Sequence, residues 1–155
     1  MLYLLFQLGN DRYALHTGQV VEVLPMVRVK ELPLSMEGAI GILDYHGTPV
    51  PLIDLSKLTL KKASRARMST RILLVDYADE AGEKRLLGLL AEKVTETMRR
   101  SDEEFVEPGV DVPAAPYLGP VTTDSHGVIQ RVEVARLLPT EVRRQLFQHS
   151  GEQAG

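Results

Sequence analysis

Residues 6–15 read FQLGNDRYAL, and this stretch decides the fold class. Apolar residues alternate on both sides of Gly9-Asn10-Asp11, whose residue types tolerate the positive φ angles of a tight turn. The pattern predicts two short antiparallel strands joined by that turn. Because Leu2 to Leu8 is an apolar run, the chain is expected to begin with a β-hairpin.

The rest of the chain continues as short apolar runs separated by turn residues, which predicts a mainly β fold with short helical turns. Further strands are expected at Val21–Leu24, Met26–Val29, Ile40–Tyr45, Thr48–Asp54, Ile72–Tyr77, Leu86–Leu90, Val94–Met98 and Val128–Val134. A C-terminal helix is expected over about residues 140–149. Pro49 and Pro51 lack N–H groups on the same edge of one strand, so that edge should be unpaired or irregular.

Composition sets the class of protein. The chain has 155 residues, of which 44% are hydrophobic and 25% charged, and this suits one globular domain spanning residues 1–155. A net charge of −3 disfavours nucleic acid as a partner. The apolar run at the N-terminus is too short to cross a bilayer and lacks the features of a signal peptide, so a cytoplasmic protein without direct membrane insertion is expected.

A basic stretch divides the chain. Residues 57–71 carry six Lys and Arg side chains and no acid. We interpret this stretch as the joint between a first lobe of about residues 1–60 and a second of about residues 70–138. Such a run is typical of a solvated linker, and the alternative is a surface for an acidic partner.

Two stretches recur in the same order on either side of this joint. Residues 13–22 align with residues 87–96, and Asp44-Tyr45-His46-Gly47 aligns with Asp124-Ser125-His126-Gly127. The order favours a duplicated β unit and hence two small barrels. The expected core comprises Leu2, Leu4, Phe6, Leu15 and Leu52 in the first lobe, and Ile72, Leu74, Leu89 and Val132 in the second.

Motifs for catalysis are absent from the sequence. Cysteine is missing, the four histidines have no zinc-site spacing, and no phosphate-binding glycine loop occurs. Asp54 is followed by Leu55 rather than by the residues of an aspartic protease, and we interpret it as a helix cap. No enzyme, cofactor or metal is therefore expected. The alternatives are a small enzyme, or a small-barrel module that binds proteins or nucleic acid without a receptor role.

The sequence resembles the CheW family of chemosensory coupling proteins. The resemblance rests on FQLGNDRYAL (6–15), QVVEVLP (19–25), LPLSMEGAIGI (32–42) and HGTPVPLIDLSKL (46–58), and it is looser in the second half. Within the family, the TPVP and YHG details favour couplers of a surface-sensing (Wsp-type) pathway over those of flagellar chemotaxis.

The resemblance implies two five-stranded SH3-like barrels packed on a shared core. It implies a non-enzymatic adaptor that couples the cytoplasmic tip of a chemoreceptor to the regulatory domain of a histidine kinase. It also implies that Val20, Glu22, Gly41, His46 and Gly47 contribute to partner binding. The family usually has arginine at position 46, so His46 is the main departure.

A strand argument supports the same surface. In an extended strand, the V-x-E spacing places Val20 and Glu22 on one face. A carboxylate on that face is costly to bury unpaired, so the face should be accessible to solvent or to a partner. We therefore expect Val20 and Glu22, with His46 nearby, to lie on a partner-binding surface rather than in the inner core.

Overall fold

The computed structural model describes residues 1–31, 38–66, 68–78, 81–110, 112–139 and 142–143. Ten strands form most of this part of the chain, which confirms the expected mainly β fold. The C-terminal helix expected over about residues 140–149 lies almost wholly outside the described residues.

The strands are β1 (Leu2–Leu8), β2 (Asp11–His16), β3 (Val20–Leu24), β4 (Lys30–Glu31), β5 (Ala39–Tyr45), β6 (Thr48–Asp54), β7 (Arg71–Ala78), β8 (Lys84–Arg99), β9 (Leu118–Asp124) and β10 (Gly127–Val132). The helical elements are α1 (Leu55–Leu60) and the single turns η1 (Thr17–Gln19), η2 (Asp102–Glu104) and η3 (Val134–Arg136). The hairpin predicted from residues 6–15 is present as β1 and β2, with Leu8 opposite Asp11.

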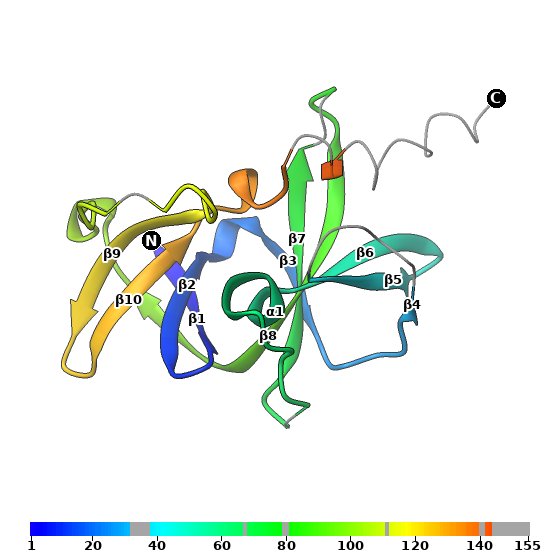
Figure 1. Cartoon of the computed structure of the whole chain (residues 1–155), viewed down its shortest axis with the longest axis horizontal. Coiled ribbons are helices and arrows are strands. Elements are labelled where there is room, and N and C mark those ends of the chain that lie inside the picture. Colours follow the sequence, from blue (N-terminus) through cyan, green and yellow to red (C-terminus); the bar gives the residue numbers. More distant parts are fainter. Residues whose placement is uncertain (32–37, 67, 79–80, 111, 140–141, 144–155) are drawn as a thin grey trace.

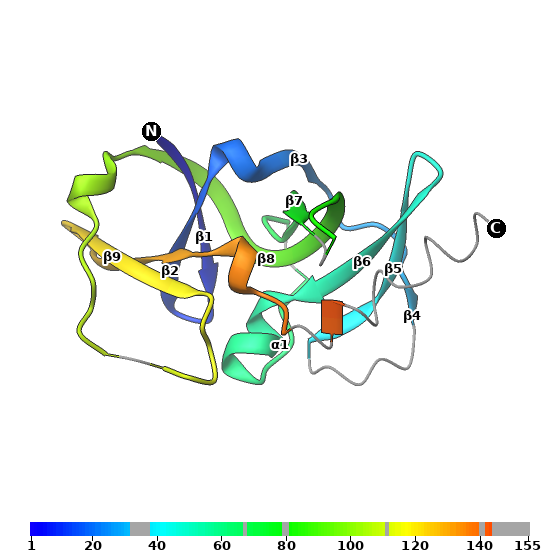
Figure 2. The same ribbon diagram turned by 90° about the horizontal axis from the view of Figure 1, so that it is seen from above.

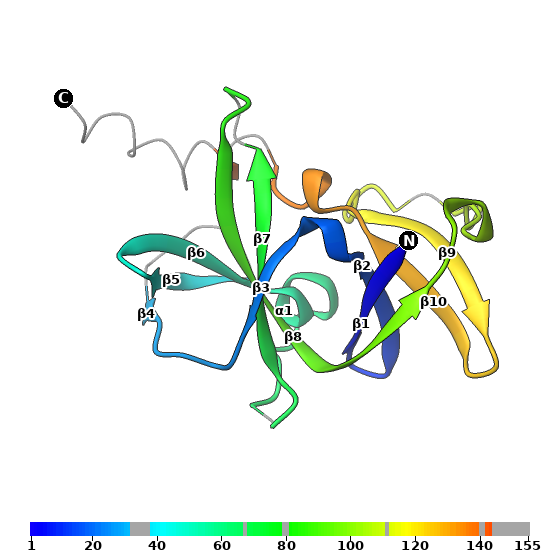
Figure 3. The same ribbon diagram turned by 180° about the vertical axis from the view of Figure 1, so that it is seen from behind.

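The strands form two curved sheets that share β8 (Figures 1 and 3). The first sheet has the order β9-β10-β2-β1-β8. The second has the order β4-β5-β6-β8-β7-β3. Each sheet contains one parallel pair between strands distant in sequence, β10 with β2 and β6 with β8. The β5–β6 and β9–β10 hairpins lie at opposite ends of the molecule.

The long strand β8 connects the two sheets. Its residues 84–91 pair with β7, and its residues from Glu92 to Arg99 pair with β1. Lys93 lies just past this change of partner and has a φ of 48°, and β8 curves from one sheet into the other (Figure 2). The two separate strands expected at Leu86–Leu90 and Val94–Met98 are therefore one bent strand.

The expected division into sequential lobes is wrong. β1 and β2 belong to the same sheet as β9 and β10, whereas β3 to β6 share a sheet with β7. The basic stretch 57–71 runs from within α1 to the first residue of β7, and β6 and β7 on either side of it belong to the second sheet, so it is not a joint between lobes. The physical reason is that long-range pairs, both parallel (β10–β2 and β6–β8) and antiparallel (β1–β8 and β3–β7), decide which strands share a sheet.

The internal repeat corresponds to equivalent places in the two sheets. Residues 13–22 carry the chain from the first sheet to the second through η1, and residues 87–96 carry it back through β8. The second repeat falls on the turns of the β5–β6 and β9–β10 hairpins.

The main core lies between the two sheets. It includes Phe6 and Leu15 from the first sheet and Leu89 from β8, and all three side chains are buried. Leu52, Ile72, Leu74 and Val132 are also buried as expected, and Leu4 is half-buried against the main core. Leu2 is 38% exposed, so its expected burial is wrong; it is the first residue of β1, at the end of the strand.

The two prolines of β6 lie where the strand has one partner. β5 pairs with β6 along its whole length, but among the described residues β8 pairs only with Leu52–Asp54. Pro49 and Pro51 therefore precede the part of β6 that is paired on both sides, which confirms the expectation from their missing donors.

Candidate functional site

The candidate site begins at β3, which follows η1. The turn η1 is capped by His16, whose Nδ1 atom accepts a hydrogen bond from the Gly18 N–H at 3.0 Å. Among the described residues, β3 pairs only with β7 and so lies at the edge of the second sheet. An edge strand is the natural position for contact with another molecule.

A bulge in β3 changes which side chains reach the surface. Val20 lies opposite Val75 and Glu22 opposite Leu74, so Val21 is an extra residue between adjacent positions of β7. The expectation that the V-x-E spacing places Val20 and Glu22 on one face is therefore wrong, because a bulge interrupts the two-residue alternation. Val20 packs half-buried against the main core, whereas Glu22 is exposed.

A row of apolar side chains is exposed on β3 and the segment after it. Val21, Val23, Met26 and Val27 are each between 40% and 46% exposed. Four large apolar residues within seven positions form what we call the β3 apolar row. Exposed apolar residues that gather in one place mark sites of protein contact more often than scattered ones do.

Tyr45, at the end of β5, connects the β3 apolar row to the β5–β6 turn. Its hydroxyl donates a hydrogen bond to Glu22 Oε1 at 2.7 Å, and its ring meets the His46 ring edge-on at a centroid distance of 4.5 Å. The hydrogen bond to the carboxylate raises the pKa of Tyr45. Glu22 and His46 are thus brought together through a residue that sequence reasoning missed, because nothing in the sequence shows that β3 faces the end of β5.

The two glycines of the predicted site serve the backbone. His46 and Gly47 form a two-residue turn with φ angles of 50° and 87°, and Asp44 Oδ1 accepts a hydrogen bond from the Gly47 N–H at 2.8 Å. Gly41 is buried in β5, where a Cβ atom would overlap the carbonyl oxygen of Lys30. Gly47 is exposed at the turn, while Gly41 lets β4 approach β5.

Of the five predicted site residues, the structure therefore places Glu22, His46 and Gly47 on the surface. Val20 is half-buried against the main core and Gly41 is buried against β4. Within the described parts of the chain, no cluster of three metal-binding side chains is present. No helix there is long and apolar enough to cross a membrane. The geometry suits the docking of another protein.

Comparison with known proteins identifies the family. The model of the CheW-like domain matches residues 2–142, which is nearly the whole chain. The chain belongs to the CheW-like domain family.

One relative and one solved structure show how far the CheW-like likeness extends. The chemotaxis protein CheW of Helicobacter pylori (strain ATCC 700392 / 26695) is 24% identical over 94 residues, which cover 61% of this chain and 54% of that protein. The chain is thus aligned over about half the length of this relative. The crystal structure of the scaffolding protein TtCheW from Thermoanaerobacter tengcongensis matches with a TM-score of 0.74 and 23% identity, covering 86% of this chain and 84% of that one. The shared CheW fold of two SH3-like barrels confirms the expected fold class.

Proposed function

We propose that this protein is a non-enzymatic cytoplasmic adaptor that couples the cytoplasmic tip of a chemoreceptor to the regulatory domain of a histidine kinase. The observation that carries the proposal is the β3 apolar row beside Glu22, Tyr45 and His46, on a chain with a CheW-like domain. The TPVP and YHG details support a surface-sensing pathway within this proposal.

The β3 apolar row suits an amphipathic helix. A receptor tip of helical hairpins presents apolar side chains at every third or fourth position, and these pack on exposed valine and methionine side chains. Glu22 and His46 add polar groups at the border of the row, where hydrogen bonds and charge select the partner and its register. Val20 and Gly41 contribute by holding β3 and β5 in place.

The proposal is tested by reconstitution with purified fragments. The full chain is mixed with a chemoreceptor cytoplasmic hairpin and with the regulatory domain of a histidine kinase from the same genome. We expect each fragment to co-elute with the chain on size exclusion, and all three together to form one larger complex. Failure of either fragment to bind, or mutually exclusive binding of the two, would contradict the coupling role.

A further inference from the structure

The basic stretch 57–71 is not explained by the proposed function. It holds a third of the chain's Lys and Arg residues, six of 18, on a protein with a net charge of −3. Like charges gathered this closely repel one another, so their concentration needs a use or a compensating structure. The structure describes all of these residues except Arg67.

Two buried carboxylates hold the backbone of this stretch. Asp54, only 3% exposed, accepts hydrogen bonds from the Ser64 N–H at 2.8 Å and from the Ser64 hydroxyl at 2.6 Å. Glu92, only 4% exposed, accepts from the Arg65 N–H at 3.0 Å and also pairs with the Arg65 Nε atom at 3.3 Å, so the charge of Arg65 is already compensated. A solvated linker would not need such anchors. Lys57 and Lys62 are exposed on this anchored segment.

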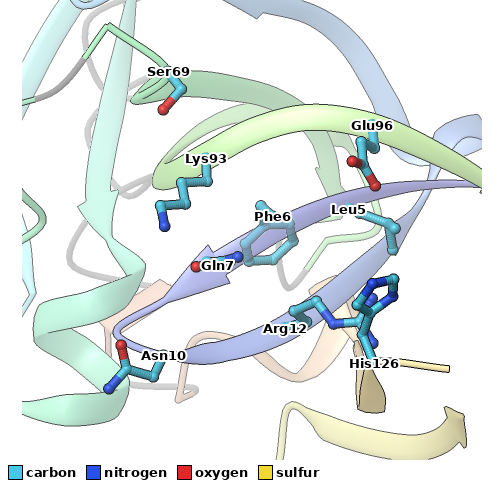
Figure 4. A pocket seen from close by; sticks show the side chains of 9 residues that line it. All are labelled: Leu5, Phe6, Gln7, Asn10, Arg12, Ser69, Lys93, Glu96 and His126. Atoms are coloured by element: carbon cyan, nitrogen blue, oxygen red, sulfur yellow. The ribbon is translucent and has the colours of Figure 1, made fainter. Parts of the chain in front are cut away.

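An open groove of about 570 Å³ adjoins this basic stretch. Ser69 belongs to both, and its carbonyl oxygen accepts a hydrogen bond from the Val94 N–H at 3.0 Å. In Figure 4, Lys93 extends from β8 toward Gln7 on β1, with Ser69 and Asn10 toward the same end. Glu96, Arg12 and His126 lie toward the other end.

Lys93 is the cation in this groove that remains to be neutralised. Arg12 already pairs with Asp124, to which its Nη1 atom donates at 2.9 Å. No ion pair of Lys93 is present within the described parts of the chain. Its φ of 48° lies in the left-handed region, where glycine would be accommodated without strain. A strained lysine at a bend suggests that its side chain has a function there.

We propose that this groove and the basic stretch beside it bind an acidic, extended segment of a partner protein. Lys93 and the exposed lysines would pair with its carboxylates, and the amides of Gln7 and Asn10 would hydrogen-bond its backbone. Glu96 lies toward the other end of the groove from Lys93 (Figure 4), so the carboxylates of the segment are expected at the Lys93 end, whereas a nucleic acid would also bring a phosphate to Glu96. A concave site also does not fit a flat anionic membrane.

This surface is separate from the β3 apolar row, and the inference does not depend on the proposed function. The groove is lined by Gln7, Asn10 and Arg12, at the turn of the β1–β2 hairpin. The β3 apolar row follows η1, which comes after the opposite end of β2. Both surfaces can therefore be occupied at once.

The test uses the full chain and a short fluorescent peptide of alternating Glu and Ser, measured by fluorescence anisotropy. We expect saturable binding that weakens as salt rises. Lys93→Gly should weaken binding roughly threefold and Lys93→Glu about tenfold, since exposed ion pairs each contribute modestly. Lys93→Gly should keep or raise the melting temperature because it relieves the positive φ. The matched control is Lys84→Glu, an exposed lysine at the start of β8.

Several results would overturn the proposal. They are no saturable binding of the acidic peptide, unchanged binding by both Lys93 variants, or equal weakening by Lys84→Glu. Tighter binding of single-stranded DNA or of phosphatidylserine vesicles than of the peptide would assign the surface to a different class of partner and would also count against it.

Discussion

At the scale of single residues, Gly41 and Gly47 show two different reasons for glycine. Gly47 needs a positive φ but has open space around its Cα, whereas Gly41 has the Lys30 carbonyl oxygen where a Cβ would lie. Gly41→Ala should therefore lower the free energy of unfolding by about 3 kcal/mol, and Gly47→Ala by about 1 kcal/mol. Urea denaturation of both variants checks this order, and a larger loss for Gly47→Ala would contradict it.

The Arg12–Asp124 pair predicts a dependence of stability on pH. The Asp124 carboxylate accepts hydrogen bonds from Arg12 and from the His126 N–H, and these hold the pKa of Asp124 well below its usual range. The contribution of this pair to the free energy of unfolding is therefore complete above the ordinary aspartate pKa of about 3.9, and it is lost as the pH falls from there toward the lower pKa of the folded state. Melting curves of the wild type and Asp124→Asn should converge between about pH 5 and pH 2. A constant difference over that range would contradict the assignment.

Single residues also show where prediction from the sequence reached its limit. Alternation correctly predicted the burial of Phe6 and Leu15. It failed at β3, because the sequence does not show that Val21 is an extra residue in a bulge. Tyr45 could not be identified as part of the site, since it contacts Glu22, which lies 23 residues earlier in the chain and on a different strand.

At the scale of elements, Asp54 connects β6, α1 and the basic stretch. It caps α1, as the sequence predicted, through the Ser56 N–H at 3.1 Å, and it also holds Ser64, which the sequence did not predict. Asp54→Ala should lower the free energy of unfolding by about 3 kcal/mol, because a cap is lost and buried donors are left unpaired. The exposed Asp11→Ala should change it by less than about 0.5 kcal/mol. Equal effects of the two variants would contradict this role for Asp54.

At the scale of the whole molecule, the main core joins the two sheets. The hairpins were predictable because their contacts are local. The assignment of strands to sheets was not predictable, because it depends on the long-range pairs β10–β2, β6–β8, β1–β8 and β3–β7. The sequence contains no local signal for such pairs.

A shared core predicts that the two sheets unfold together. Phe6→Ala should lower the free energy of unfolding by about 3–5 kcal/mol in one cooperative transition, because Phe6 is fully buried between the sheets. The exposed neighbour variant Leu2→Ala should have a much smaller effect. Two separate transitions in urea, followed by circular dichroism and tyrosine fluorescence, would contradict a common core.

The central claim is that the β3 apolar row and Glu22 form a protein-docking surface. The most direct measurement is the affinity of the full chain for a labelled chemoreceptor cytoplasmic hairpin, compared across Glu22→Lys, Val23→Asp and the control Val128→Asp. Val128 is 58% exposed on β10, away from β3. The account predicts that both β3 variants bind at least about tenfold more weakly, with nearly unchanged melting temperatures, while the control binds like the wild type. Wild-type affinity in both β3 variants, or an equal loss in Val128→Asp, would contradict it.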